Sequence, residues 1–141
     1  MNEVKNVLRL VLAVIFAVGA AANANRLSAD PGAFSDFASV SFLPFYRTLW
    51  TAWVFPNIQV WVGIVIVLEA VIALLLLWKG RLPRIGMLLA AAFMVFLIPF
   101  WWLGGSLVNL AFALVFAWLL RSEYPDTIPD LLRGKGRVCG E

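Results

Sequence analysis

The residue most able to do chemistry in this sequence is Glu69, an acid within a long apolar run. Eleven residues separate it from Asn57 and nine separate it from Lys79. On a helix it would therefore lie roughly 15–18 Å from either end. Placing an acid at that depth in a bilayer costs at least about 2.5 kcal/mol. We expect Glu69 to face the interior of a helix bundle, where it is paired, hydrogen-bonded or protonated.

Glu69 has two interpretations from sequence. It is either a proton-linked or ligand-binding acid, or a structural hydrogen-bonding group that fixes helix packing and contributes about 0.6–2 kcal/mol. The possible polar partners are Asn23, Asn25, Arg26 and Asn109, and of these we expect Arg26 and Asn109 beside Glu69. Arg9 is a further candidate, although it also fits a basic anchor at the edge of the first helix.

Aromatic residues form a second candidate feature. Four tryptophans lie near the same expected ends of the apolar segments: Trp53, Trp61, Trp101 and Trp102. They could line a pocket for a flat hydrophobic headgroup such as a quinone. The alternative is an aromatic belt that only anchors the protein at the membrane interface.

The residue types that are missing exclude several kinds of chemistry. The chain has no histidine and a single cysteine, Cys139. It therefore lacks the commonest metal ligand, the usual general base near neutral pH and any Cys-x-x-Cys redox pair. We see no catalytic residues, no metal site and no intrinsic cofactor, although a bound quinone is compatible with the sequence. An enzyme acting alone is the least favoured interpretation.

The elements that position these residues are expected to be membrane helices. Hydrophobic residues make up 63% of the 141 residues and charged residues 13%, against about 45–50% and 25% in soluble domains. Four apolar stretches, at about 4–25, 57–78, 84–103 and 105–121, approach the length that a spanning helix needs. The sequence predicts an all-α bundle of four transmembrane helices, forming one domain over residues 1–121. The first stretch has an alternative as a cleaved signal peptide, because Ala22-Asn23-Ala24 resembles a cleavage site.

Basic residues predict the orientation of the bundle. Only Arg26 and Arg47 fall in the long loop between the first two stretches. The other nine of the eleven lie on the opposite side: Lys5, Arg9, Lys79, Arg81, Arg84, Arg121, Arg133, Lys135 and Arg137. The positive-inside rule makes that side cytoplasmic, so both termini are expected there.

Two further segments complete the predicted organisation. The outer loop, 26–56, is rich in aromatic residues and contains Asp30-Pro31, a typical helix start. We expect one or two short amphipathic helices in it, interrupted at Pro44 and Pro56. Residues 122–141 combine prolines, glycines and mixed charges, and predict a flexible cytoplasmic tail.

This pattern resembles the DoxX-like family of small four-helix bacterial membrane proteins. The resemblance covers about residues 7–120. It rests on Leu8-Arg9-Leu10 with Gly19 downstream, on Gly63 to Glu69 followed by Lys79-Gly80-Arg81, on Met87 to Met94, and on Asn109-Leu110-Ala111. The chain departs from the family at Ala22, where members often carry a lysine that could pair with the glutamate.

The resemblance implies a bacterial inner-membrane protein that acts as a non-catalytic accessory subunit of a quinone-linked redox complex. Its expected partners are the lipid bilayer and other membrane subunits or further copies of itself, and no nucleic acid. Two alternatives remain open, both of which use Glu69. One is a quinone- or lipid-binding membrane protein, and the other is a small proton-coupled transporter.

Overall fold

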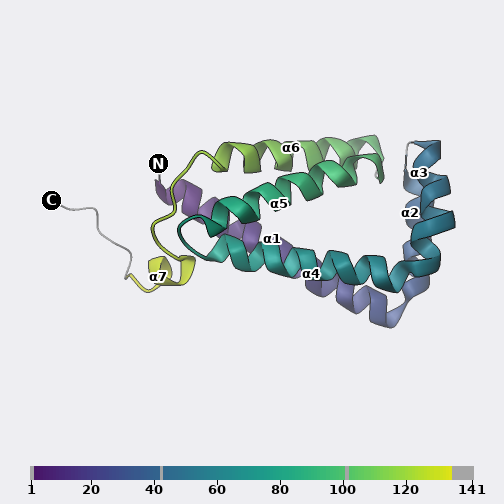
Figure 1. Ribbon diagram of the computed structural model, residues 1–141, viewed down its shortest axis with the longest axis horizontal. Helices are drawn as coiled ribbons and strands as arrows, with labels where there is room; N and C mark the ends of the chain where they lie inside the picture. The colour runs from purple at the N-terminus through teal and green to yellow at the C-terminus, as the bar shows by residue number, and fades with distance from the viewer. Residues whose placement is uncertain (1, 42, 101, 135–141) are drawn as a thin grey trace.

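The structure is a computed structural model that describes residues 2–41, 43–100 and 102–134. These residues are almost entirely helical and contain no strand, which confirms the predicted all-α class. Four longer helices make up most of the molecule: α1 (Asn2–Ala29), α4 (Ile58–Leu77), α5 (Leu82–Leu97) and α6 (Leu103–Leu119). They lie lengthwise, α1 against α4, α4 against α5, and α5 against α6 (Figure 1).

Three of these helical segments are long and apolar enough to cross a membrane: Glu3–Ala29, Pro44–Leu77 and Leu82–Phe100. α6 is apolar but shorter, at 17 residues. The helices also expose large hydrophobic side chains on their outer faces, such as Val67 and Leu88. Apolar residues on both the inner and the outer faces are typical of helices surrounded by lipid. The chain therefore has the character of a helical membrane protein.

The two ends of the bundle differ. The start of α1 and the short helix α7 (Ile128–Leu132) lie at one end, which we call the terminal end (Figure 1). Short helical pieces stand across the other, capped end: η1 (Pro31–Asp36), α2 (Phe37–Val40) and α3 (Pro44–Leu49). The expected helices of the 26–56 loop are therefore present, and Pro44 begins one of them.

The chain turns sharply between α3 and α4. A π-helical turn, η2 (Trp50–Val54), and a 3₁₀ turn, η3 (Phe55–Asn57), join the two helices. Pro56 lies in this junction and has no N–H to donate to a regular helix. The irregular turns let α3 lie across the bundle while α4 runs along it (Figure 1).

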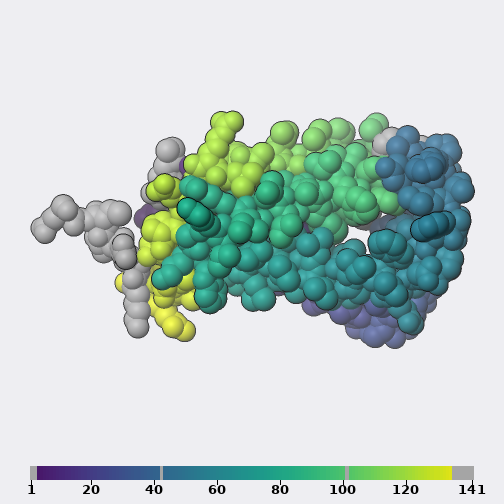
Figure 2. Space-filling model, viewed as in Figure 1, coloured from purple at the N-terminus to yellow at the C-terminus, as the bar shows by residue number. Residues whose placement is uncertain are grey.

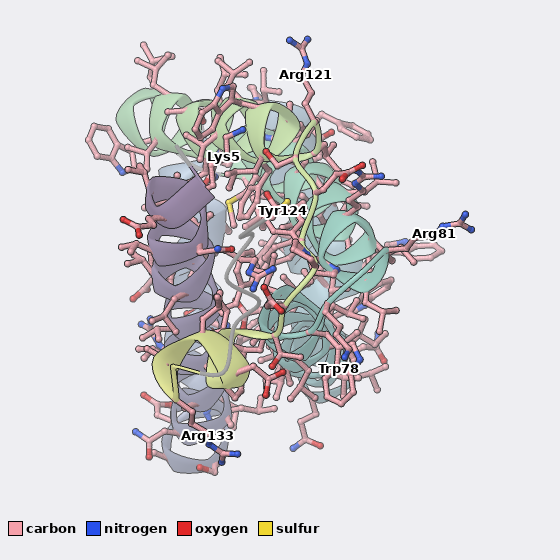
Figure 3. All side chains as sticks on the ribbon, turned by 90° about the vertical axis from the view of Figure 1, so that its left-hand side faces the viewer. Lys5, Trp78, Arg81, Arg121, Tyr124 and Arg133 are labelled. Atoms are coloured by element: carbon pink, nitrogen blue, oxygen red, sulfur yellow. The ribbon has the colours of Figure 1, made fainter. Side chains whose placement is uncertain are left out.

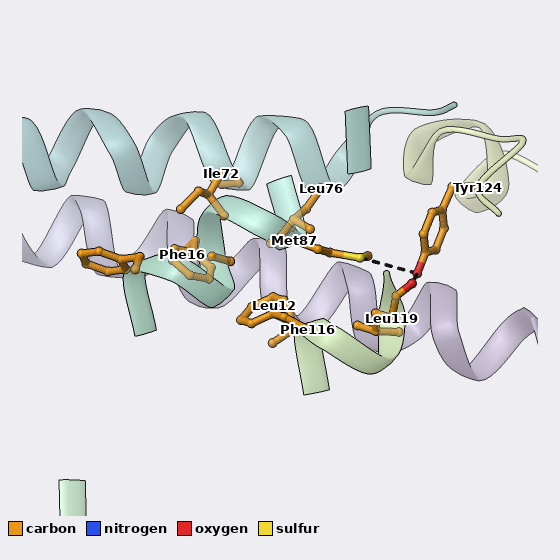
Figure 4. Packing of buried hydrophobic residues seen from close by; sticks show 12 residues of the cluster. Leu12, Phe16, Ile72, Leu76, Met87, Phe116, Leu119 and Tyr124 are labelled. Atoms are coloured by element: carbon orange, nitrogen blue, oxygen red, sulfur yellow. Dashed lines mark hydrogen bonds between the residues drawn. The ribbon is translucent and has the colours of Figure 1, made fainter. Parts of the chain in front are cut away.

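The main core fills the half of the bundle nearest the terminal end. Leu12, Ile72, Leu76 and Met87 are buried there, and they come from three different helices (Figure 4). Phe16 joins them, with its ring centroid 6.3 Å from that of Phe93 and 5.9 Å from that of Phe116. These contacts tie α1 to both α5 and α6, so the terminal half is closed by packed side chains.

A segment that the sequence assigned to a flexible tail, residues 122–134, packs against the terminal end. Tyr124 is buried, and its hydroxyl donates to the carbonyl oxygen of Leu119 at 2.9 Å (Figure 4). The backbone N–H of Gly80 donates to the carbonyl oxygen of Tyr124 at 2.7 Å, and Arg84 Nε donates to the carbonyl oxygen of Ser122 at 3.0 Å. Residues 135–141, the rest of the expected tail, are outside the described residues.

Candidate functional site

Glu69 lies in the middle of α4 and is almost completely buried, with 8% of its surface exposed. Asn23 Nδ2 of α1 donates a hydrogen bond to Glu69 Oε2 at 2.9 Å. A Cβ atom at Gly19 would lie only 3.0 Å from Glu69 Oε1. The absence of a side chain at Gly19 therefore lets the carboxyl group approach α1.

Interior positions recur every seven residues along the long helices, because seven residues make nearly two turns. On α1 these positions are Arg9, Phe16 and the half-buried Asn23, and on α4 they are Val62, Glu69 and Leu76. On α5 they are Gly86 and Phe93, and Phe100 continues the series in the 3₁₀ turn η4 (Ile98–Phe100) that follows α5. On α6 they are the half-buried Asn109 and Phe116. On three of the helices, the position one heptad from the main core toward the capped end is polar. These residues are Asn23 on α1, Glu69 on α4 and Asn109 on α6.

Asn109 is the third polar residue on an inner stripe. It lies one heptad before Phe116 on α6, while Asn23 lies one heptad after Phe16 on α1. The rings of Phe16 and Phe116 are in contact, and α1 and α6 run in opposite directions. Both asparagines are therefore displaced by about 10 Å from that contact, toward the capped end. They sit at a similar level in the bundle.

The amide nitrogen of Asn109 is buried and has no hydrogen-bond acceptor within the described part of the chain. A buried amide donor without a partner costs about 1–3 kcal/mol. Such groups are rare in native structures, and each needs an explanation such as strain, a functional role, or an ordered water or ion. The level of Asn23 and Glu69 therefore contains an unused donor as well as a carboxyl group.

The bundle opens near this level. The α1–α4 pair and the α5–α6 pair diverge toward the capped end (Figure 1). The surface is hollowed between α4 and α5 beside the cap, as Figure 2 shows. The helices are thus packed closely around Phe16 and Phe93 and are separated beyond them.

The cap is held over the opening by aromatic contacts. Phe100, the last residue of η4, lies 4.7 Å from Tyr46 and 5.9 Å from Trp50, measured between ring centroids. Trp50 Nε1 donates to the carbonyl oxygen of Phe34 at 2.9 Å, and Ser41 Oγ donates to that of Pro99 at 2.7 Å. The cap therefore bridges the two helix pairs. Tyr46 and Trp50 follow helical spacing in the aromatic loop and were recognisable from the sequence, whereas Phe100 was not among the residues proposed from it.

The basic residues proposed from sequence occupy two other places. Arg26 is exposed, donates to the carbonyl oxygen of Ala33 at 3.4 Å, and lies 5.5 Å from the ring centroid of Phe34. It fastens η1 to the end of α1. Arg9 is buried at the terminal end, about 21 Å from Asn23 along α1. Asn23, which the sequence offered as a possible partner but not as a preferred one, donates the hydrogen bond to Glu69.

The tryptophans proposed to line a pocket are exposed wherever the structure describes them. Trp53, Trp61 and Trp102 are all strongly exposed, with 69%, 44% and 59% of their surfaces accessible. The ring of Trp102 lies against Gly104. Trp101 is outside the described residues. The exposed three have the orientation of an interfacial belt, whereas the ring contacts under the cap come from Tyr46 and Trp50.

The site offers hydrogen bonding in an apolar enclosure. Within the described ranges, no group of three or more acidic, histidine or cysteine side chains could hold a metal ion. The polar atoms available are one carboxyl group and two primary amides, from Glu69, Asn23 and Asn109. These can accept and donate hydrogen bonds to carbonyl or hydroxyl groups, and Glu69 can exchange a proton.

The comparisons with known proteins give no identification. No family model matches the sequence, and no curated protein and no solved structure is significantly similar to it. The DoxX-like resemblance therefore stays a prediction based on the residues quoted for it.

Proposed function

We propose that this chain is a four-span membrane protein that binds a small, flat, amphipathic molecule between its two helix pairs. The observation that carries the proposal is the unpartnered amide of Asn109 at the level of the Glu69–Asn23 hydrogen bond. A quinone suits this arrangement, because its ring is apolar and its carbonyl oxygens accept hydrogen bonds. Asn109 would donate to one carbonyl oxygen, and a protonated Glu69 would donate to another.

The proposed orientation follows the distribution of charge. Both termini lie on the cytoplasmic side, since the basic residues gather at the terminal end. The cap then lies at the outer surface, where its aromatic residues meet the lipid headgroups. α6 would span the bilayer with its 17 residues, which include Gly104, Gly105 and Ser106 at its outer end. A bacterial inner membrane is the location that the resemblance implies.

The accessory-subunit and transporter hypotheses remain predictions. The first rests on the resemblance to a family, and the second on Glu69 as a proton-linked acid. No contact between the described residues favours either of them over simple ligand binding. Both are compatible with a bound quinone, which a redox complex would exchange with its partners.

The experiment that tests the proposal is mass spectrometry of small molecules that stay bound to the full chain after gentle detergent extraction. We expect a quinone or similar amphiphile with the wild-type protein and a several-fold lower amount with Glu69→Leu, because leucine can neither donate nor accept a hydrogen bond. Glu123→Leu is the matched control, since Glu123 is exposed at the terminal end. Equal retention by all three proteins, or no retained molecule even after quinone is added, would refute the proposal.

A further inference from the structure

A second site lies at the terminal end and is independent of the proposed function. Arg9 has none of its surface exposed. Its Nη2 atom donates to the carbonyl oxygen of Asp126 at 3.1 Å, and its guanidinium lies 4.7 Å from the ring centroid of Tyr124. The segment 122–134 therefore covers the only arginine on an inner stripe of the described helices.

The remaining donors of Arg9 have no acceptor. Both Nε and Nη1 are buried and make no hydrogen bond within the described residues. The side chain of Asp126 attracts the guanidinium electrostatically, but it accepts no hydrogen bond from these two nitrogens. An arginine cannot lose its charge to escape this environment. Burying a charge with unmet donors is costly, so a further acceptor is expected there.

The surroundings of Arg9 favour an anion. Lys5 lies one helical turn closer to the terminus of α1, on the same face, with its Nζ 5.2 Å from the ring centroid of Trp118. Arg84 is close enough to act on Tyr124 electrostatically, as Arg9 does. Lys5 and Tyr124 both lie at the terminal end, which faces the viewer in Figure 3. Lys5 and Arg84 therefore add positive charge at the end of the bundle where Arg9 is buried.

We propose that Arg9 binds a phosphate group beneath the C-terminal segment, with Lys5 at its entrance. A phosphate group carries several acceptor oxygens, as the separate donors Nε and Nη1 require, and arginine is the side chain best suited to it. The phosphate can belong to the headgroup of an anionic lipid or to a free ion.

The test uses the purified full chain in detergent and measures its affinity for three probes: phosphatidylglycerol, phosphatidylcholine and inorganic phosphate. Native mass spectrometry counts bound lipid, and thermal unfolding reports all three. We expect saturable binding of phosphatidylglycerol, inorganic phosphate or both, and at least about a tenfold loss in Arg9→Gln. Binding of inorganic phosphate would identify a free ion as a sufficient ligand, and binding of the lipid alone would identify a headgroup site.

Controls keep the outcome decisive. Arg121→Gln removes an exposed cation at the same end and should leave the affinity unchanged. Asp126→Asn keeps the backbone carbonyl and removes a competing negative charge, so it should bind the anion more tightly and serves if Arg9→Gln does not fold. The proposal is overturned if no anion binds saturably, if Arg9→Gln and Arg121→Gln respond alike, or if Asp126→Asn leaves the affinity unchanged.

Discussion

Gly19 lies directly against the carboxyl group of Glu69, and this close approach can be tested by adding one methyl group. Gly19→Ala would place a Cβ atom 3.0 Å from Glu69 Oε1. The carboxyl group must then move and weaken its hydrogen bond with Asn23. We expect quinone retention to fall several-fold. Retention is measured by mass spectrometry of the extracted protein.

Gly63→Ala is the matched control for that substitution. Gly63 also lies in a membrane helix, but a Cβ atom there has no neighbour within 4 Å. Alanine is the better helix former by about 1 kcal/mol, so Gly63→Ala should bind normally and unfold at a slightly higher temperature. If the two alanine variants retain the same amount of ligand, the position of the Glu69 carboxyl group is irrelevant to binding.

Tyr124 should make the stability of the protein depend on pH at high pH. Burial raises the pKa of its hydroxyl above the usual 10.0, although Ser122, Arg9 and Arg84 oppose this shift. The folded state therefore holds a proton that the unfolded state releases. Its contribution to stability is intact below about pH 10 and is lost as the pH rises through the folded pKa.

Tyr124→Phe removes this titration. At neutral pH it should lower the free energy of unfolding by about 1 kcal/mol, because the bond to the Leu119 carbonyl oxygen is lost. Above pH 10 its stability should decline less steeply than that of the wild type, as measured by thermal unfolding in detergent. Tyr46→Phe, in the cap, should decline as the wild type does. An equally steep decline in Tyr124→Phe would contradict the assignment.

At the scale of elements, the α4–α5 pair depends on a second glycine. A Cβ atom at Gly86 would lie 2.9 Å from Leu75 Cβ and 3.3 Å from the backbone nitrogen of Leu76. The obstacle is partly backbone, which cannot rotate away. Gly86→Ala should therefore destabilise the bundle by about 1–3 kcal/mol through overpacking, measured by thermal or denaturant unfolding. Stability equal to that of Gly63→Ala would show that α4 and α5 do not pack this closely.

The elements were largely predictable, whereas their junctions were not. Long apolar runs specify membrane helices because few alternatives satisfy the backbone in lipid. Glu69 was identifiable because an acid at the centre of such a run is costly. Asn23 could be named as one possible partner of Glu69 but could not be selected over Arg26 and Asn109, because pairing across helices depends on how α1 rotates against α4. The packing of residues 122–134 was also not predicted, because prolines and glycines in the sequence favour a flexible tail. In the structure, Tyr124 and Ile128 of this segment are buried.

For the whole molecule, the proposed orientation places the cap and the termini on opposite sides of the membrane. Cys139 is the only cysteine, so it reports the terminal side directly. Ser39, which is exposed in the cap, can report the other side as Ser39→Cys in a Cys139→Ser background. We expect a membrane-impermeant maleimide to label position 39 in intact cells and to label Cys139 only after permeabilisation. The reverse result would invert the orientation.

The molecule combines a closed half and an open half. Packing around Phe16 holds the terminal half together, and the aromatic cap bridges the helix pairs where they diverge. The polar residues lie between these two regions. A ligand that joins both helix pairs would therefore stabilise the molecule as a whole and should raise its unfolding temperature.

Photoaffinity mapping with a short-chain quinone that carries a photoreactive group tests directly whether the ligand binds between the two helix pairs. If the quinone binds there, adducts should form on the inner stripes of α4 and α6 near Glu69 and Asn109. An excess of unlabelled quinone should prevent their formation. Adducts confined to exposed positions such as Val67 and Leu88, with no competition from unlabelled quinone, would contradict binding between the helix pairs.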